Sequence, residues 1–157
     1  MTVLLEKTRR TCLCLALLAV VLHGIGCSPG VPEITIAEQN ATLSPVIVGS
    51  GSLFMKIINA GRGEDALVRA QVSIPGALVE LHDVDEGKMV RTDRIRIPGQ
   101  STVQLRPAGV HLMIYKMPKN VTEGYKFILT LSFEKTGDMF VPMRFIDNAT
   151  VRKTRQF

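Results

Sequence analysis

Short apolar runs separated by turn residues recur along most of the chain. Runs of strand length, with no stripe of helical period, predict an antiparallel β-sandwich or barrel. Nearly every break between runs contains Gly or Pro, which suit the dihedral angles of turns. We therefore expect an all-β fold. The predicted strands are Leu53–Asn59, Ala66–Ile74, Leu78–Asp83, Lys88–Ile97, Thr102–Arg106, Val110–Tyr115, Tyr125–Glu134 and Met139–Phe145.

The two ends of the chain lack this pattern. Residues 28–44 contain Pro, Gly and Asn and are interpreted as a tether that leads into a β-domain at residues 45–147. Residues 148–157 form a basic tail, which we expect to be frayed. The 157 residues are thus predicted to contain one folded domain.

Residues 1–27 have the features of an export signal. Basic residues precede an apolar run, Thr11–Leu22, that has the length of a signal-peptide core. A membrane-spanning helix would need about 20 apolar residues. The run leads into Gly26-Cys27, which is similar to the lipobox of bacterial lipoproteins, although Gly24 replaces the usual Leu. We expect Cys27 to carry a lipid anchor, with unlipidated cleavage or an uncleaved anchor as alternatives.

Removal of this segment changes the charge and the available chemistry. It takes away three of the 19 basic residues and one of the 14 acidic residues, so the net charge falls from +5 to +3. That excess is too small to indicate nucleic-acid binding, and aromatic residues, 5% of the chain, are few for base stacking. All three cysteines lie at or before residue 27. Their absence from the domain excludes disulfides, thiolate metal sites, blue copper and a cysteine nucleophile.

Both histidines that follow residue 27 lie on predicted strands. Because side chains alternate between the faces of a strand, Glu80 and His82 share one face, and the Glu marks that face as solvent-facing. On the later strand His111 and Met113 share the outward face, opposite the core-facing Leu112. A Met on an exposed face is unusual, because it gains little from burial there.

Two imidazoles and two thioethers together form a soft, neutral donor set that suits Cu(I) better than Zn(II) or hard cations. Any one of these residues alone would more often be an ordinary surface or core residue, but the set uses every histidine of the domain. Met117, Met139 and Met143 are interpreted as core or surface residues. The candidate metal ligands are His82, Met89, His111 and Met113.

The spacing of these residues resembles that of the PCuAC family of periplasmic copper chaperones. In that family a His and a Met are followed by a spacer of 21 residues and then by His-x-Met, and here residues 90–110 are that spacer. Phe54–Gly61 is similar to the family's Y-M-x-I-x-N-x-G strand, and Val103–Gly109 to its V-x-L-x-P-G-G turn. The resemblance covers residues 45–145.

Two departures from the family pattern concern Met89. Only six residues separate it from His82, a shorter interval than in the family, and Arg91 stands where many members have a second Met. Two alternatives therefore stay open. One is a three-ligand site of His82, His111 and Met113, and the other is a member that binds no metal.

The resemblance implies a cupredoxin-like Greek-key β-sandwich that holds Cu(I) at its surface. It also implies a periplasmic metallochaperone, soluble or held at the membrane by a lipid on Cys27. Such a protein passes copper by ligand exchange to a thioredoxin-like assembly protein or a respiratory oxidase subunit. We expect a monomer with no enzymatic activity, since no catalytic triad spacing or phosphate-binding loop is present. The alternative is a β-sandwich lipoprotein with a structural or interaction role and no metal.

Overall fold

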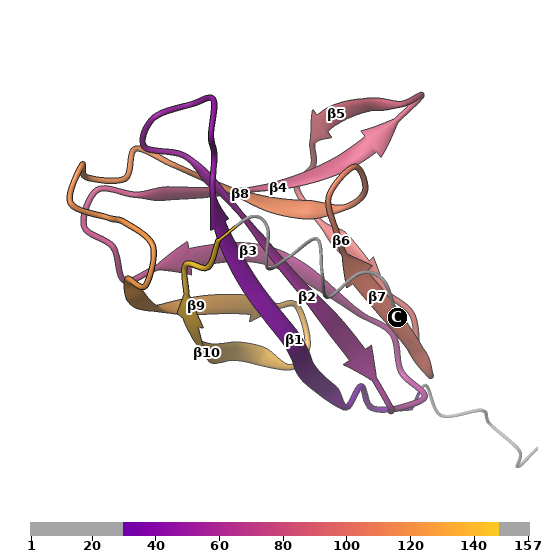
Figure 1. The fold of residues 1–157 in the computed structure, drawn as a ribbon. Coiled ribbons are helices and arrows are strands. Elements are labelled where there is room, and N and C mark those ends of the chain that lie inside the picture. The colour runs from indigo at the N-terminus through magenta and orange to yellow at the C-terminus, as the bar shows by residue number, and fades with distance from the viewer. Residues whose placement is uncertain (1–29, 148–157) are drawn as a thin grey trace, which may run out of the picture.

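The computed structural model describes residues 30–147, which form two packed antiparallel β-sheets (Figure 1). This range contains no helix, so none of the described segments could cross a membrane as one. The expected all-β sandwich is confirmed. Its strands are β1 (Ile34–Leu43), β2 (Gly51–Asn59), β3 (Asp65–Val72), β4 (Leu78–Asp85), β5 (Lys88–Arg91), β6 (Ile95–Ile97), β7 (Ser101–Leu105), β8 (His111–Tyr115), β9 (Lys126–Phe133) and β10 (Gly137–Arg144).

The strand order of the first sheet brings distant segments together. This sheet has the order β1-β2-β8-β4-β5. β8 pairs with the first part of β2, and β7 pairs with the second part. The second sheet has the order β10-β9-β3-β6. Because β8 lies between β2 and β4, its side chains meet those of two strands that precede it by many residues in sequence.

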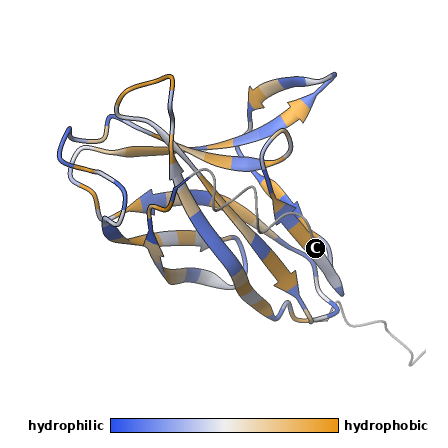
Figure 2. Cartoon of the chain, in the orientation of Figure 1, coloured by the Kyte–Doolittle hydropathy of each residue, from blue (hydrophilic) through white to orange (hydrophobic). Residues whose placement is uncertain are grey.

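Alternation along β2 shows how the core forms. Leu53, Met55 and Ile57 point between the sheets and are at most 2% exposed. Ser52 and Phe54, which alternate with them along the strand, lie half-buried on the outer face. The same alternation of hydrophobic and hydrophilic positions is visible along the strands in Figure 2. Each fully buried aliphatic side chain contributes about 1.5–3 kcal/mol relative to exposure.

The segment interpreted as a tether contains a strand, which corrects the predicted domain boundary. Within residues 28–44, β1 pairs antiparallel with β2, and its Ala41 is fully buried. The register shifts between Ala37 and Asn40, at a bulge where Glu38 has a positive φ of 53°. A bulge adds one residue, so the inward positions change parity within β1 and the alternation in the sequence is lost.

The predicted strand Lys88–Ile97 is two strands in different sheets. Its first part, β5, pairs with β4 in the first sheet, and its second part, β6, pairs with β3 in the second. The break lies at Thr92–Arg94, where Thr92 Oγ1 donates to the Arg94 carbonyl oxygen at 3.0 Å. No Gly or Pro marks this crossing between sheets. The predicted signal segment 1–27, Cys27 and the basic tail 148–157 lie outside the described residues.

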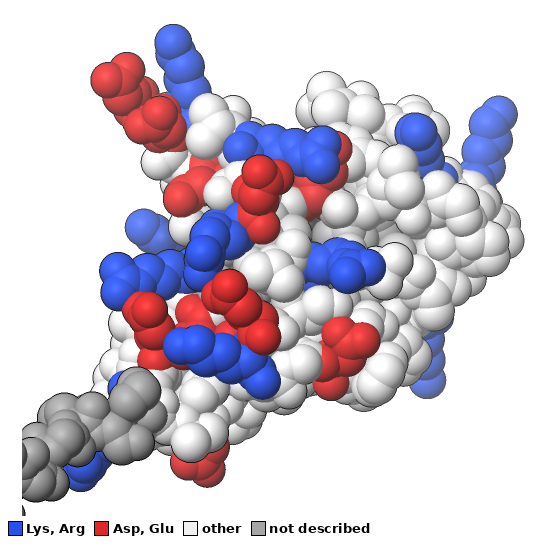
Figure 3. Space-filling view, turned by 180° about the vertical axis from the view of Figure 1, so that it is seen from behind, with Lys and Arg blue, Asp and Glu red and all other residues white. Residues whose placement is uncertain are grey.

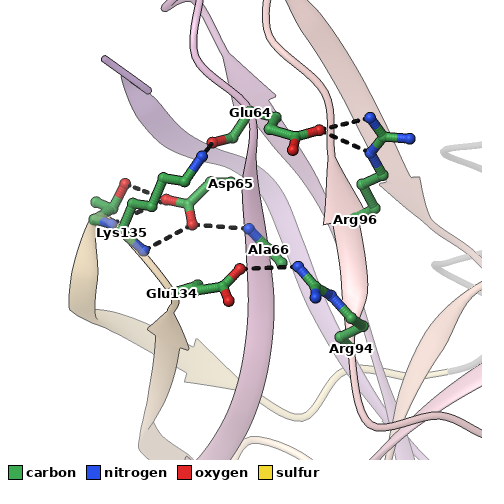
Figure 4. A network of polar contacts seen from close by, with 8 residues as sticks. Glu64, Asp65, Ala66, Arg94, Arg96, Glu134 and Lys135 are labelled. Atoms are coloured by element: carbon green, nitrogen blue, oxygen red, sulfur yellow. Dashed lines mark hydrogen bonds and ion pairs between the residues drawn. The ribbon is translucent and has the colours of Figure 1, made fainter. Parts of the chain in front are cut away.

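A buried carboxylate lies at the start of β3, beside the turn that joins β9 to β10 (Figure 4). Asp65 is 2% exposed, and its Oδ1 accepts from the backbone N–H groups of Ala66 at 2.8 Å and Lys135 at 2.9 Å. Its Oδ2 accepts from the backbone N–H of Thr136 at 2.9 Å and from the Thr136 hydroxyl at 2.6 Å. Both oxygens therefore have two donors each, as a buried carboxylate requires.

Acidic and basic side chains are interspersed on the face opposite to the view of Figure 1 (Figure 3). Close to Asp65, exposed ion pairs join Arg94 to Glu134 at 2.8 Å and Arg96 to Glu64 at 2.6 Å. The Arg96 guanidinium holds the pKa of Glu64 below its usual value. Exposed pairs of this kind contribute little to stability, so the buried Asp65 is the structural centre of this region.

Candidate metal centre

The pairing of β4 with β8 places the two histidines of the domain side by side. His82 lies directly opposite His111, and their ring centroids are 5.6 Å apart. One step along the same face, Glu80 lies directly opposite Met113. The neighbouring Leu81 and Leu112 are buried in the core, so these four side chains project from the outer face of the first sheet.

His111 presents one free ring nitrogen. Its Nδ1 lies 2.7 Å from the carbonyl oxygen of Gly109. A carbonyl only accepts, so Nδ1 carries the hydrogen and the lone pair of the neutral ring is on Nε2. A metal-binding histidine commonly has its other nitrogen held in this way by a backbone carbonyl.

His82 also has one bonded and one free ring nitrogen. Its Nε2 lies 3.3 Å from Oε2 of Glu80. Its Nδ1 is buried and has no hydrogen-bond partner, which is true of no other buried side-chain N or O within residues 30–147. A buried polar atom left unpaired costs about 1–3 kcal/mol. Coordination of a metal ion would use this lone pair, so the histidine fits the role of a ligand.

Met113 completes a group of three donors. It is half-buried on β8, and the Ser52 hydroxyl of β2 donates to its Sδ at 3.1 Å. The pairing of β2 with β8 sets Ser52 directly opposite Met113. A thioether is only a weak acceptor. This contact therefore orients Met113 and leaves its sulfur able to bind a soft metal.

Met89 lies on the same face of the sheet, one row beyond the two histidines on the side away from Met113. It is opposite Val84 on the β4–β5 hairpin, whereas the position directly opposite His82 is taken by Arg91. Its side chain is 61% exposed. The structure thus brings His82, His111 and Met113 together and leaves Met89 at the margin of the group.

The face that carries these residues points outward, but the histidines on it have little solvent exposure. His111 is only 3% exposed, and the side chain of His82 is 14% exposed, so the expectation of solvent-facing histidines is wrong in degree. The rings of Phe54 and Tyr115 lie beside them, at 6.5 Å from His111 and 6.4 Å from His82. These aromatic rings shield the imidazoles from water.

Glu80 affects the electrostatics of the patch. Burial, and second the nearby Glu80 carboxylate, raise the pKa of the Tyr115 phenol above its usual value. Glu80 Oε1 is also 3.3 Å from Nη1 of the exposed Arg91. No group of three or more His, Cys, Asp or Glu within residues 30–147 is arranged to hold a metal ion.

The sequence did not predict three of the hydrogen-bond partners of the histidines and Met113. Glu80 served there only as a marker of the solvent face, although its position two residues before His82 could have indicated contact with the ring. The hydroxyl of Ser52 and the carbonyl of Gly109 gave no signal. Their roles depend on strand register and on backbone geometry.

Solved structures with the same fold include PCuAC domains. The copper-bound PCuAC domain from PmoF2 superposes with a TM-score of 0.60 at 24% identity, over 72% of this chain and 92% of that one. The apo PCuAC domain from PmoF1 gives 0.63 at 20% identity, over 74% and 95%. CuI-DR1885 from Deinococcus radiodurans gives 0.59 at 19% identity, over 72% and 79%. These likenesses show the fold, which is the cupredoxin-like β-sandwich of the PCuAC domains, as the resemblance implied.

Comparison of sequences identifies the family. The model of the family described as "Putative lipoprotein LpqE-like" matches residues 34–144, so the chain belongs to this LpqE-like family. The "Putative lipoprotein Lxx21020" of Leifsonia xyli subsp. xyli (strain CTCB07) is 26% identical over 156 residues, which cover 89% of this chain and 93% of that protein.

Proposed function

We propose that this protein is a Cu(I) metallochaperone whose site is formed by His82, His111 and Met113, with Met89 as the fourth ligand. The observation that carries the proposal is the group of three neutral donors on one sheet face. Each histidine has one held nitrogen and one free nitrogen. Imidazole and thioether donors without a thiolate suit a monovalent soft ion.

The partial burial of the site suits a carrier. The aromatic rings of Phe54 and Tyr115 limit the access of water, while Met89 on the exposed hairpin can move toward the ion or release it. An acceptor could enter from the exposed side and replace one ligand at a time. Net transfer would then follow the difference in copper affinity between the two proteins.

Location and partners extend this proposal. Cys27 would carry the lipid of a lipoprotein and hold the domain at the outer side of the cytoplasmic membrane, in the periplasm. The copper acceptor would be a thioredoxin-like assembly protein or the copper centre of a respiratory oxidase. Membership of a lipoprotein family supports the anchor. Mass spectrometry of the mature N-terminus would test it, and an unmodified or absent Cys27 would contradict it.

Competition titration of Cu(I) against a chromophoric chelator tests the proposed site. We expect stoichiometric binding by the purified protein, and a loss of affinity of at least about tenfold in His111→Ala and in Met113→Leu, because even the partners of metal ligands contribute that much. Met139→Leu is the matched control, since Met139 is a partly buried thioether of β10 that packs against the core. Equal affinities in all four proteins would contradict the site and favour a lipoprotein without metal.

A further inference from the structure

The carboxylate of Glu80 lies between a histidine and an arginine, with one oxygen on each. Oε2 is 3.3 Å from Nε2 of His82, and Oε1 is 3.3 Å from Nη1 of Arg91. The Glu80 side chain is 32% exposed, whereas that of Arg91 is 68% exposed. The arginine therefore covers the solvent side of the carboxylate, while the other oxygen is directed at the imidazole.

This contact decides which nitrogen of His82 carries the hydrogen. An ionised carboxylate can only accept, so the neutral ring bonded to it is protonated on Nε2 and has its lone pair on Nδ1. That Nδ1 is the buried atom with no partner. At His111 the backbone carbonyl of Gly109 holds Nδ1 instead, which leaves Nε2 free. The two opposed histidines thus present different ring nitrogens.

We propose that Glu80 is a positioning residue that selects Nδ1 of His82 as the copper-binding atom, and that Arg91 keeps the carboxylate directed at the ring. This inference rests on the proposed function. Arg91 lies directly opposite His82 in the β4–β5 hairpin, so the hairpin contributes a partner for Glu80 beside this ring. Outer partners of metal-binding histidines are worth about 10–100-fold in affinity.

The tautomer of His82 can be measured without copper. Long-range proton–nitrogen NMR spectra of the ¹⁵N-labelled apoprotein, recorded at about pH 8 where ordinary histidines are neutral, separate the two tautomers of each ring. We expect His82 to be protonated on Nε2 and His111 on Nδ1. Glu80→Ala should shift His82 toward the other tautomer or a mixture. Glu80→Gln should preserve Nε2 protonation, because its single amide oxygen can still accept from the ring while the exposed Arg91 loses its acceptor.

Copper affinity completes the test. We expect Glu80→Ala to lower Cu(I) affinity about 10–100-fold and Glu80→Gln to stay within a few-fold of wild type. Asp83→Asn is the matched control. It removes a neighbouring exposed carboxylate that accepts from the backbone N–H of Val84. Thermal unfolding of each variant identifies any loss caused by misfolding, and Glu80→Gln retains the shape of the side chain.

Three results would overturn the positioning role. These are His82 protonated on Nδ1 in the wild type, a tautomer unchanged in Glu80→Ala, or an unchanged copper affinity in that variant. A wild type that binds no Cu(I) would instead overturn the proposed function together with the copper part of this inference. The tautomer measurement therefore separates the two failures.

Discussion

Two buried polar clusters of this domain differ in how completely their hydrogen bonds are satisfied. At the start of β3, Asp65 is 2% exposed and accepts four hydrogen bonds, two on each oxygen. On the outer face of β4 and β8, His111 is 3% exposed and the His82 side chain 14%, yet each ring has only one nitrogen bonded. The first cluster needs no further partner, whereas the second has unused lone pairs that point to a ligand.

The contrast separates stabilising from functional burial. A buried polar group that is fully bonded adds to stability and to the specificity of the fold. One with an unused lone pair lowers stability, and natural proteins keep such groups mainly at functional sites. The two clusters should therefore respond in opposite ways to substitution, with stability affected at Asp65 and copper binding at the histidines.

The largest effect on stability is expected for Asp65→Ala. The substitution leaves the backbone N–H groups of Ala66, Lys135 and Thr136 without their acceptor, and the free energy of unfolding should fall by about 2–4 kcal/mol. Denaturant unfolding measures the change, and the copper affinity of the folded protein should be unchanged. Asp138→Ala, at an exposed acidic residue of β10, is the control. A loss below about 0.5 kcal/mol would show that Asp65 is not the structural centre.

Acidification should weaken the stabilisation that the Asp65 cluster provides. Burial tends to raise the pKa of Asp65, but the hydrogen bonds from Thr136, Lys135 and Ala66 outweigh it and lower the pKa below the usual 3.8. The stabilisation is therefore complete above the unfolded pKa and is lost as pH falls through the lower folded value. The stability difference between wild type and Asp65→Asn should be constant near neutral pH and shrink below about pH 4. A difference that stays constant down to pH 2 would contradict this.

Much of the fold could be predicted from the sequence because Gly and Pro mark most of its turns. The exceptions have physical causes. The bulge at Glu38 reverses the inward parity of β1, and the chain leaves the first sheet between β5 and β6 without Gly or Pro. In both places the local pattern of hydrophobic residues no longer reports the strand boundaries.

The candidate site was less accessible to prediction than the fold. The spacing of His82, His111 and Met113 indicated chemistry, and alternation gave the correct face. The partners of these residues depend on the register of β4 and β2 against β8, which joins residues far apart in sequence. The burial of His111 depends on Phe54 of another strand. No local pattern contains either piece of information.

The histidine cluster should show the opposite response to the Asp65 cluster. His82→Leu removes a buried nitrogen without a partner and keeps the site filled, so the free energy of unfolding should be unchanged or rise by up to about 1 kcal/mol. Cu(I) affinity should nevertheless fall at least about tenfold. Denaturant unfolding and chelator competition on the same sample test both parts. Destabilisation by more than about 2 kcal/mol would place His82 with Asp65 as a structural residue.

A smaller effect is expected for Met89→Leu. The exposed Met89 side chain would have to become ordered to bind copper, and the lost freedom of up to about 2 kcal/mol offsets much of the gain from a fourth ligand. We expect a loss of Cu(I) affinity of only a few-fold, clearly below that of Met113→Leu, with no change in stability. Competition titration of both variants gives the comparison. A loss equal to that of Met113→Leu would make Met89 a full ligand, and no loss would indicate the three-ligand site.

The smallest expected effect concerns Tyr115, which responds to Glu80 from within the histidine cluster. Burial is the main cause of its raised pKa and the Glu80 carboxylate is the second, so Glu80→Gln should lower this pKa while leaving it above 10.0. Ultraviolet titration near the phenolate band measures it, and Tyr115→Phe removes the contribution of Tyr115 so that of Tyr125 can be subtracted. An unchanged pKa in Glu80→Gln would show that Arg91 neutralises the field of the carboxylate. In that case Glu80 would be as fully compensated as Asp65, and the electrostatic part of the contrast between the two clusters would disappear.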